Sequence, residues 1–249
     1  MIVLGIETST ARSSVALLVD GTVVAEEHHE DARGHGAFLA PAMRRCLDAA
    51  PVVDGAAHVD AVAVGTGPGL YTGLRVGMAT AAAFATARGL PIVGVGGMDA
   101  LAHAEARDGT LVTTIDARRG QVFWSVHRVD DTGGAVRADG PRVGTREELD
   151  ATCATLAEDG PVRIVGEVGG DDIRRPDAAD TARLALRMLG TTPHDELVAE
   201  RLEPVYLRDA DVRIGWTERG GVRVGDGGPA NGPASGPASV PDGVPGGAA

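Results

Sequence analysis

Two short segments of this chain carry residue types that could bind a phosphate group. In the first, three hydroxyl side chains follow Glu7 at the end of an apolar run. In the second, a glycine-proline turn at residues 65–69 opens directly into a long alanine-rich segment. Glycine lets the backbone approach a ligand closely, and a helix N-terminus presents free N–H groups to an anion. The candidate phosphate or nucleotide ligands are therefore Thr8, Ser9, Thr10, Gly67 and Gly69. The alternative is that the hydroxyls bond the backbone of their own turn.

Other reactive groups are sparse in this sequence. All 23 basic side chains are Arg, and without Lys the chain can form neither a Schiff base nor the lysine contact of a phosphate-binding P-loop. His28, Glu30 and His35 could hold a metal ion. However, the adjacent His28 and His29 would point to opposite faces of a strand, which favours solvated polar side chains. We therefore expect no catalytic residue and no metal site.

The composition restricts the partners and the compartment. The chain has 249 residues and a formal net charge of −12, so it is poorly suited to bind nucleic acid alone, because phosphate contacts need Lys and Arg. Cys46 and Cys153 match no metal or redox spacing. The N-terminal apolar run stops at Glu7, unlike a signal peptide, and no run approaches the ~20 residues of a membrane span. We expect a cytoplasmic protein that does not enter a membrane.

The pattern of apolar residues and turn signals predicts two series of strands and helices. In the first series, strands are expected at 2–6, 14–19, 22–26, 59–64 and 92–95, and helices at 38–47 and 72–88. Pro41 is expected to kink or delay the first of these helices. In the second series, strands are expected at 111–115, 121–129, 135–143 and 162–165, and helices at 146–156 and 177–189. Asp116 and Arg118, in the turn after residue 115, are interpreted as an ion pair rather than a site.

This order of elements predicts an α/β fold with two βββαβα-type subdomains, which is the actin-like or ribonuclease-H-like architecture. We place the N-terminal subdomain at residues 1–98 and the C-terminal subdomain at residues 99–214. From residue 215 to residue 249 the chain is rich in Gly, Pro and Ala and has almost nothing to bury, so this segment is expected to be a disordered tail.

The helix expected at 72–88 has an unusual surface. Small residues recur at every fourth position from Gly73 to Ala85, and Arg75 and Arg88 are the only charged side chains. Small residues at this spacing let another helix approach closely. The row either packs inside its own domain or meets a partner protein. Together with the apolar stripe of the preceding helix, the candidate partner interface consists of Phe38, Met43, Leu47, Gly73, Gly77 and Ala81.

Several segments, in the same order along the chain, resemble the TsaB (YeaZ) family. The most specific of them reads Gly-Pro-Gly-Leu-Tyr-Thr-Gly-Leu-Arg at residues 67–75. The others are Ile6–Thr10, His35–Pro41, Asp116–Phe123 and Pro204–Arg208. The resemblance spans about residues 1–208.

The resemblance implies a role in making threonylcarbamoyladenosine at adenosine 37, next to the anticodon, of tRNAs that read codons beginning with A. Members of this family pair with a paralogue, TsaD, which transfers the threonylcarbamoyl group, and a small ATPase, TsaE, joins them. The pairing implied by the resemblance uses helices 36–50 and 72–88. The tRNA would be bound only through the complex, ATP and magnesium would be used by the partners, and the chain alone would form a weak homodimer.

The resemblance also bears on catalysis. TsaD holds a metal through a His-x-x-x-His pair just after the strand that follows the glycine helix, and the aligned positions here are Gly97 and Leu101. We therefore favour a non-catalytic scaffold subunit, a pseudoenzyme that activates TsaD. One alternative is a stand-alone nucleotide-dependent phosphotransferase of the same fold, with Glu7 in the place of a magnesium-binding Asp and weak nucleotide binding at the neighbouring hydroxyls. A metalloprotease-related protein is less favoured.

Deleting residues 220–249 tests the expected tail. Because this segment has no apolar periodicity, the truncated chain is expected to keep its melting temperature nearly unchanged in a calorimetric scan. A loss of several degrees would show that the tail docks on the domain.

Overall fold

The computed structural model describes residues 1–31, 33–53, 56–107, 109–130, 133–170, 173–191 and 202–207. The strands are β1 (Ile2–Glu7), β2 (Ser13–Val19), β3 (Thr22–His29), β4 (Val52–Val53), β5 (Ala56–Ala57), β6 (Ala61–Gly67), β7 (Ile92–Gly96), β8 (Thr110–Arg118), β9 (Gln121–Val129), β10 (Ala135–Thr145) and β11 (Val162–Gly166). The helices are α1 (His35–Asp48), α2 (Tyr71–Arg88), α3 (Gly97–Ala104), α4 (Arg146–Ala157) and α5 (Ala178–Thr191). The tail expected at residues 215–249 lies outside the described residues.

Two sheets repeat one strand order. In the first sheet the order is β3-β2-β1-β6-β7, with β1 antiparallel to β2 and parallel to β6. In the second sheet the order is β10-β9-β8-β11, with β8 antiparallel to β9 and parallel to β11. Each sheet is thus a three-stranded antiparallel meander whose first strand also pairs, in parallel, with a later strand. The predicted actin-like α/β fold is confirmed.

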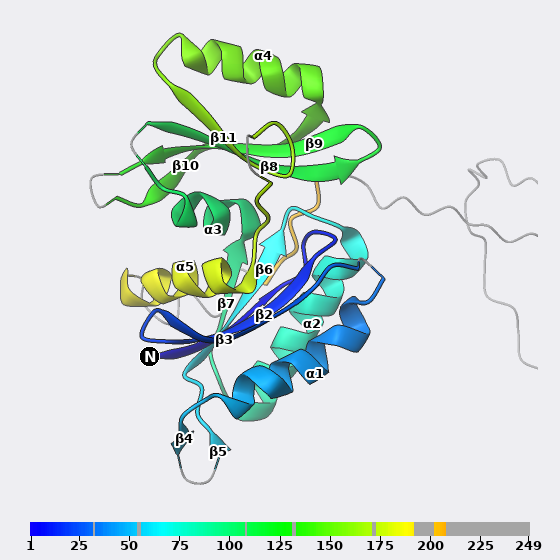
Figure 1. The fold of residues 1–249 in the computed structure, drawn as a ribbon, viewed down its shortest axis with the longest axis vertical. Coiled ribbons are helices and arrows are strands. Elements are labelled where there is room, and N and C mark those ends of the chain that lie inside the picture. Colours follow the sequence, from blue (N-terminus) through cyan, green and yellow to red (C-terminus); the bar gives the residue numbers. More distant parts are fainter. Residues whose placement is uncertain are drawn as a thin grey trace, which may run out of the picture. The chain divides into compact units, whose positions relative to one another are not determined.

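Helices cover the first sheet on both faces (Figure 1). Helices α1 and α2 pack against one face and helix α5 against the other. Side chains alternate along β1, so that Leu4 and Ile6 face α1 and α2 while Val3 faces α5. Because neither face meets solvent, β1 and β6 are buried along their whole length, which explains their nearly continuous apolar sequence.

Helix α3 lies between the two sheets (Figure 1). Its Met98 packs with Ile115 and Phe123 of the second sheet, and α3 also contacts α5 on the first sheet. Helix α4 covers the other face of the second sheet through the buried Leu149. The start of α4 is fixed by a capping box, in which the Thr145 side chain and the side chain three residues later bond each other's backbone N–H groups.

The predicted elements differ from the structure in several places. The hairpin of β4 and β5 has no predicted counterpart. Helix α5, which is expected in the C-terminal subdomain at residues 99–214, packs against the first sheet instead. Helix α1 begins at His35, so Pro41 lies inside the helix and does not delay its start. Strand β6 continues past its predicted end at Val64, as far as Gly67. Helix α3 has no predicted counterpart, because a short helix that starts at a glycine has little intrinsic stability. Its buried Leu101 shows that packing between the sheets stabilises it instead.

No helix in the described part of the chain is both long enough and apolar enough to cross a membrane.

A pair of substitutions on α2 tests how this helix is oriented. Ala81 is 0% exposed in the core between α2 and the first sheet, whereas Ala79 on the same helix is exposed. Ala81→Glu buries an unpaired charge and is expected to lower the free energy of unfolding by about 3 kcal/mol or more. Ala79→Glu is expected to change it by less than about 0.5 kcal/mol in the same urea titration. Equal losses in the two variants would contradict the orientation.

Candidate functional site

The loop after β1 is closed by the glycine turn. Thr8 Oγ1 donates a hydrogen bond to the Gly73 carbonyl at 2.8 Å, and the Leu70 N–H donates to the Ser9 carbonyl at 2.8 Å. A Cβ at Gly69 would overlap that same Ser9 carbonyl, so the turn needs a glycine there to lie directly on the loop.

The closed loop corrects the interpretation of its hydroxyls as open phosphate ligands. Thr8, Ser9 and Thr10 are at most 2% exposed. The Thr10 hydroxyl accepts a hydrogen bond from the Arg12 N–H at 3.2 Å, which is a local turn contact. Ser9 Oγ is buried and has no hydrogen-bond partner within the described residues. The alternative, in which the hydroxyls bond the backbone of their own turn, describes Thr10, whereas Thr8 bonds the first turn of α2.

Glu7 is a buried carboxyl beneath this loop. Its Oε1 accepts a hydrogen bond from the Ser9 N–H at 2.7 Å, and its Oε2 accepts one from the Thr181 hydroxyl of α5 at 3.3 Å. Burial raises the pKa of Glu7 above its ordinary value, and these hydrogen bonds only partly oppose the rise. The carboxyl is 1% exposed, so it is placed to link β1 to α5 rather than to hold a solvated cation.

The candidate interface residues on the two helices are mostly internal. Gly73 and Gly77 face the loop after β1, where a Cβ at either position would overlap an atom of Thr8. Ala81 is 0% exposed and Met43 is 5% exposed, and both belong to the core of the first sheet. These four residues therefore form no exposed surface, which corrects the prediction that they meet a partner.

Phe38 and Leu47 of α1, the other two candidates, are half-buried and pack against the same core. The Phe38 ring also stacks on His29 of β3, with 5.4 Å between the ring centroids. They remain the two candidate residues with exposed surface.

A second row on α2 faces outward. It starts two residues before the glycine row and repeats at every fourth position, and each of its members is exposed. This outward row consists of Tyr71, Arg75, Ala79, Ala83 and Ala87. Small residues recur in both rows, so the sequence does not show which row is buried. The glycine row is the buried one, because Gly77 lies so close to Thr8 that a side chain there would overlap it.

The start of the outward row is tied to the segment of residues 202–207. Arg75 Nε donates to the Tyr206 hydroxyl at 2.9 Å, and the Arg75 guanidinium lies 4.0 Å from the centroid of the Tyr71 ring. The two tyrosine rings lie 5.0 Å apart. The Val205 N–H donates to the Thr66 carbonyl at the end of β6, at 2.8 Å. The chain's two tyrosines thus join this segment to the first turn of α2.

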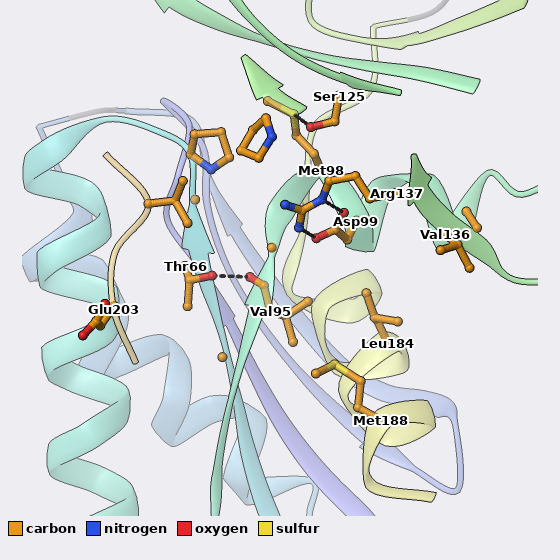
Figure 2. A pocket seen from close by; sticks show the side chains of 17 residues that line it. Thr66, Val95, Met98, Asp99, Ser125, Val136, Arg137, Leu184, Met188 and Glu203 are labelled. Carbon is orange, nitrogen blue, oxygen red and sulfur yellow. Dashed lines mark hydrogen bonds and ion pairs between the residues drawn. The ribbon is translucent and has the colours of Figure 1, made fainter. Parts of the chain in front are cut away.

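A cleft of about 900 Å³ opens at the carboxyl ends of β6 and β7 (Figure 2). Leu184 and Met188 of α5 form one wall, Val136 of β10 another, and Glu203 a third. Of the candidate phosphate ligands only Gly67 lines it. Carboxyl ends of parallel strands are the usual place for ligands in α/β sheets.

One charged network lies on the wall of this cleft. Asp99 of α3 accepts a hydrogen bond from Arg137 Nε at 2.9 Å and a second from Arg137 Nη2. The buried His127 Nε2 lies 3.0 Å from the same carboxylate. Burial opposes the charge of Asp99, but the hydrogen bonds from His127 and Arg137 outweigh it and hold the pKa of Asp99 below its ordinary value. Sequence analysis missed all three residues, because they come from three separate elements with no shared motif.

The remaining candidates do not form a metal site. His28 lies 3.2 Å from Glu26, and the buried His35 bonds Ser13. Within the described residues, no three His, Cys, Asp or Glu side chains come together as metal ligands. Asp116 and Arg118 form the predicted ion pair at 3.2 Å, on the surface.

Known proteins with similar sequences were found for this chain. The family model described as "TsaD: tRNA N6-adenosine threonylcarbamoyltransferase" matches residues 22–143. An uncharacterized protein of Mycobacterium leprae is 41% identical over 161 residues, which are 63% of this chain and 42% of that protein. The tRNA threonylcarbamoyladenosine biosynthesis protein TsaB of Escherichia coli is 34% identical over 137 residues, 53% of this chain and 58% of that protein. The matches span less than two thirds of the length of these two relatives.

Solved structures give a longer match. An uncharacterized protein with similarity to the peptidase YeaZ, from Pseudomonas aeruginosa, superimposes with a TM-score of 0.66 at 28% identity, over 83% of this chain and 99% of that chain. Fold and matches together define an actin-like α/β protein with two related sheets. Within that class, the chain belongs to the TsaB (YeaZ) family, as its sequence motifs predict.

Glu7→Gln tests the buried carboxyl through the pH dependence of stability. Because the folded-state pKa of Glu7 is raised, its contribution to stability is fully present below the unfolded pKa of about 4.3 and is lost as pH rises through the folded pKa. The variant cannot titrate at this position. Urea unfolding between about pH 5 and pH 8 is expected to show a stability decline in the wild type that is smaller in the variant.

Glu158→Gln, at the exposed end of α4, is the matched control and should follow the wild-type pH profile. If the stability of the wild type and of Glu7→Gln changed with pH in the same way, burial would not raise the pKa of Glu7.

Proposed function

We propose that this chain is a non-catalytic subunit that binds and activates a TsaD-type threonylcarbamoyltransferase acting on tRNA. The observation that carries the proposal is the outward row of α2. A helix on a protein surface normally turns charged and polar residues to the solvent. Here the row offers Ala79, Ala83 and Ala87 to the solvent, and Arg75 is its one charged member. Such a face costs little to desolvate and is suited to be covered by a partner.

Helix α1 extends this surface, because it packs beside α2 on the same face of the first sheet (Figure 1). Its exposed residues include Ala37, Ala40 and Pro41. The proposed interface therefore uses the two helices that the family resemblance implies, but through their outward faces rather than through the glycine row. Without its partner the chain would expose this face, and weak self-association through it is the expected result.

The site chemistry supports a non-catalytic role. By the family resemblance, Gly97 and the fully buried Leu101 of α3 align with the two histidines that hold the metal in TsaD, and neither side chain can ligate a metal. The closed loop at Thr8 leaves no open hydroxyl cradle for a nucleotide phosphate, which disfavours the phosphotransferase alternative.

The partners follow from the charge and from the family. The chain carries a net charge of −12, so tRNA would be held by the other subunits rather than by this one. ATP and magnesium would be used by TsaD and by the ATPase TsaE. In support, curated relatives of Escherichia coli and Bacillus subtilis that are 34% and 35% identical to this chain are named as threonylcarbamoyladenosine biosynthesis proteins.

Ala83→Glu tests the interface and the role together. The substitution places an unpaired charge in the covered face, so the dissociation constant for the TsaD of the same host is expected to rise about 100-fold, which is about 2.7 kcal/mol. Calorimetric titration measures it, and a tRNA assay with purified components should show threonylcarbamoyl transfer that falls in parallel. The wild-type chain alone is expected to transfer nothing.

Ala154→Glu, on the exposed face of α4, is the matched control and should bind TsaD like the wild type. Full-strength binding by a folded Ala83→Glu chain would place the interface elsewhere. Transfer by the isolated chain would refute the non-catalytic role.

A further inference from the structure

Among the described residues, strand β7 lies at the edge of the first sheet and pairs with β6 alone. The direction of its backbone groups follows from two hydrogen bonds to β6. The Val62 N–H donates to the Pro91 carbonyl at 2.9 Å, and the Thr66 hydroxyl donates to the Val95 carbonyl at 3.1 Å. Backbone groups alternate in direction along a strand, so Pro91 and Val95 face β6, and the N–H and C=O of Gly94 face away from it.

These two groups of Gly94 are buried and have no hydrogen-bond partner in the part of the chain that the structure describes. Gly94 is a buried residue, and since β6 is the one described strand that pairs with β7, neither the N–H nor the C=O of Gly94 has a hydrogen-bond partner among the described residues. A buried backbone group without a partner costs about 1–3 kcal/mol, and such groups are rare in folded proteins. Gly94 lines the 900 Å³ cleft, so its free donor and acceptor face a space that a ligand can enter.

A cationic group lies further along the same edge. A Cβ placed on Gly96 would be 3.4 Å from Arg137 Nη2, which puts the guanidinium two residues, or about 7 Å, from Gly94. Arg137 bonds Asp99 through Nε and Nη2, and Nη1 makes no hydrogen bond within the described residues. Figure 2 shows Arg137 and Asp99 side by side on the wall of the cleft. A guanidinium nitrogen of this kind can donate to a carboxylate.

We propose that this cleft binds an extended peptide segment with an acidic side chain, supplied by another protein. The main chain of the peptide adds to the edge of β7 and exchanges hydrogen bonds with both groups of Gly94. Its acidic side chain, two residues away, reaches Arg137. Its apolar side chains lie against Leu184 and Met188 of α5. A donor and an acceptor side by side on one strand edge match a peptide residue, which is the basis of strand addition to sheet edges.

The test uses the full chain and a synthetic probe, acetyl-Thr-Val-Thr-Val-Glu amide. Titration to millimolar concentration is followed through the backbone amide signals of the protein by NMR. The Gly94 amide is expected to shift with saturation. N-methylation of the peptide at each position in turn is expected to weaken binding at alternate residues only, because only every second N–H faces β7. Replacing the peptide's Glu by Gln is expected to weaken binding at least fivefold.

Arg137→Met should remove the preference for Glu over Gln, and Arg142→Met is the matched control on the same strand, β10. Since the N-methyl scan is done on the wild-type chain, it remains decisive if Arg137→Met does not fold. An unshifted Gly94 amide, or N-methyl effects without a period of two, would overturn the proposal. Equally tight binding of acetyl-Glu amide alone would also overturn it, because the site would then hold a small anion. TsaD is absent from this test, so its result is independent of the proposed function.

Discussion

The N-terminal half of the molecule depends on one close contact between the loop after β1 and the first turns of α2. Thr8 Oγ1 donates to the Gly73 carbonyl at 2.8 Å, and any side chain at Gly77 would overlap the same hydroxyl. The contact tolerates only glycine on that side, so it fixes the rotation of α2 about its own axis. The opposite side, with Ala79 and Ala83, is turned outward as a consequence.

The same contact supports the proposed role as a binding subunit. Where a phosphate loop would need open hydroxyls and backbone N–H groups, this chain uses Thr8 and Ser9 to hold its own glycine turn. Glu7, directly beneath, bonds Thr181 of α5 and so joins β1 to a helix that comes late in the sequence. We infer that residues at the position of an active site have taken a structural role, and that the functional surface lies on the other side of α2.

The sequence predicted the fold well because periodicity and turn signals are local. Gly89 ends α2 in a left-handed conformation, and Gln121–Val129 forms a strand of the predicted length. It could not predict which of the two small-residue rows on α2 is buried, because that depends on the steric fit against Thr8. Nor could it predict the group of Asp99, His127 and Arg137, which only the packing of α3 between the two sheets brings together.

The central claim is that the outward row of α2 is covered when a TsaD-type partner binds. Cysteine accessibility tests it most directly. Ala83→Cys and Ala154→Cys place thiols on exposed positions of α2 and α4. Peptide masses separate position 83 from the native cysteines, and fragment-ion spectra separate position 154 from its neighbour Cys153. With saturating TsaD of the same host, maleimide labelling at position 83 should fall at least tenfold while labelling at position 154 stays unchanged. Undiminished labelling at position 83 in the saturated complex would contradict the account.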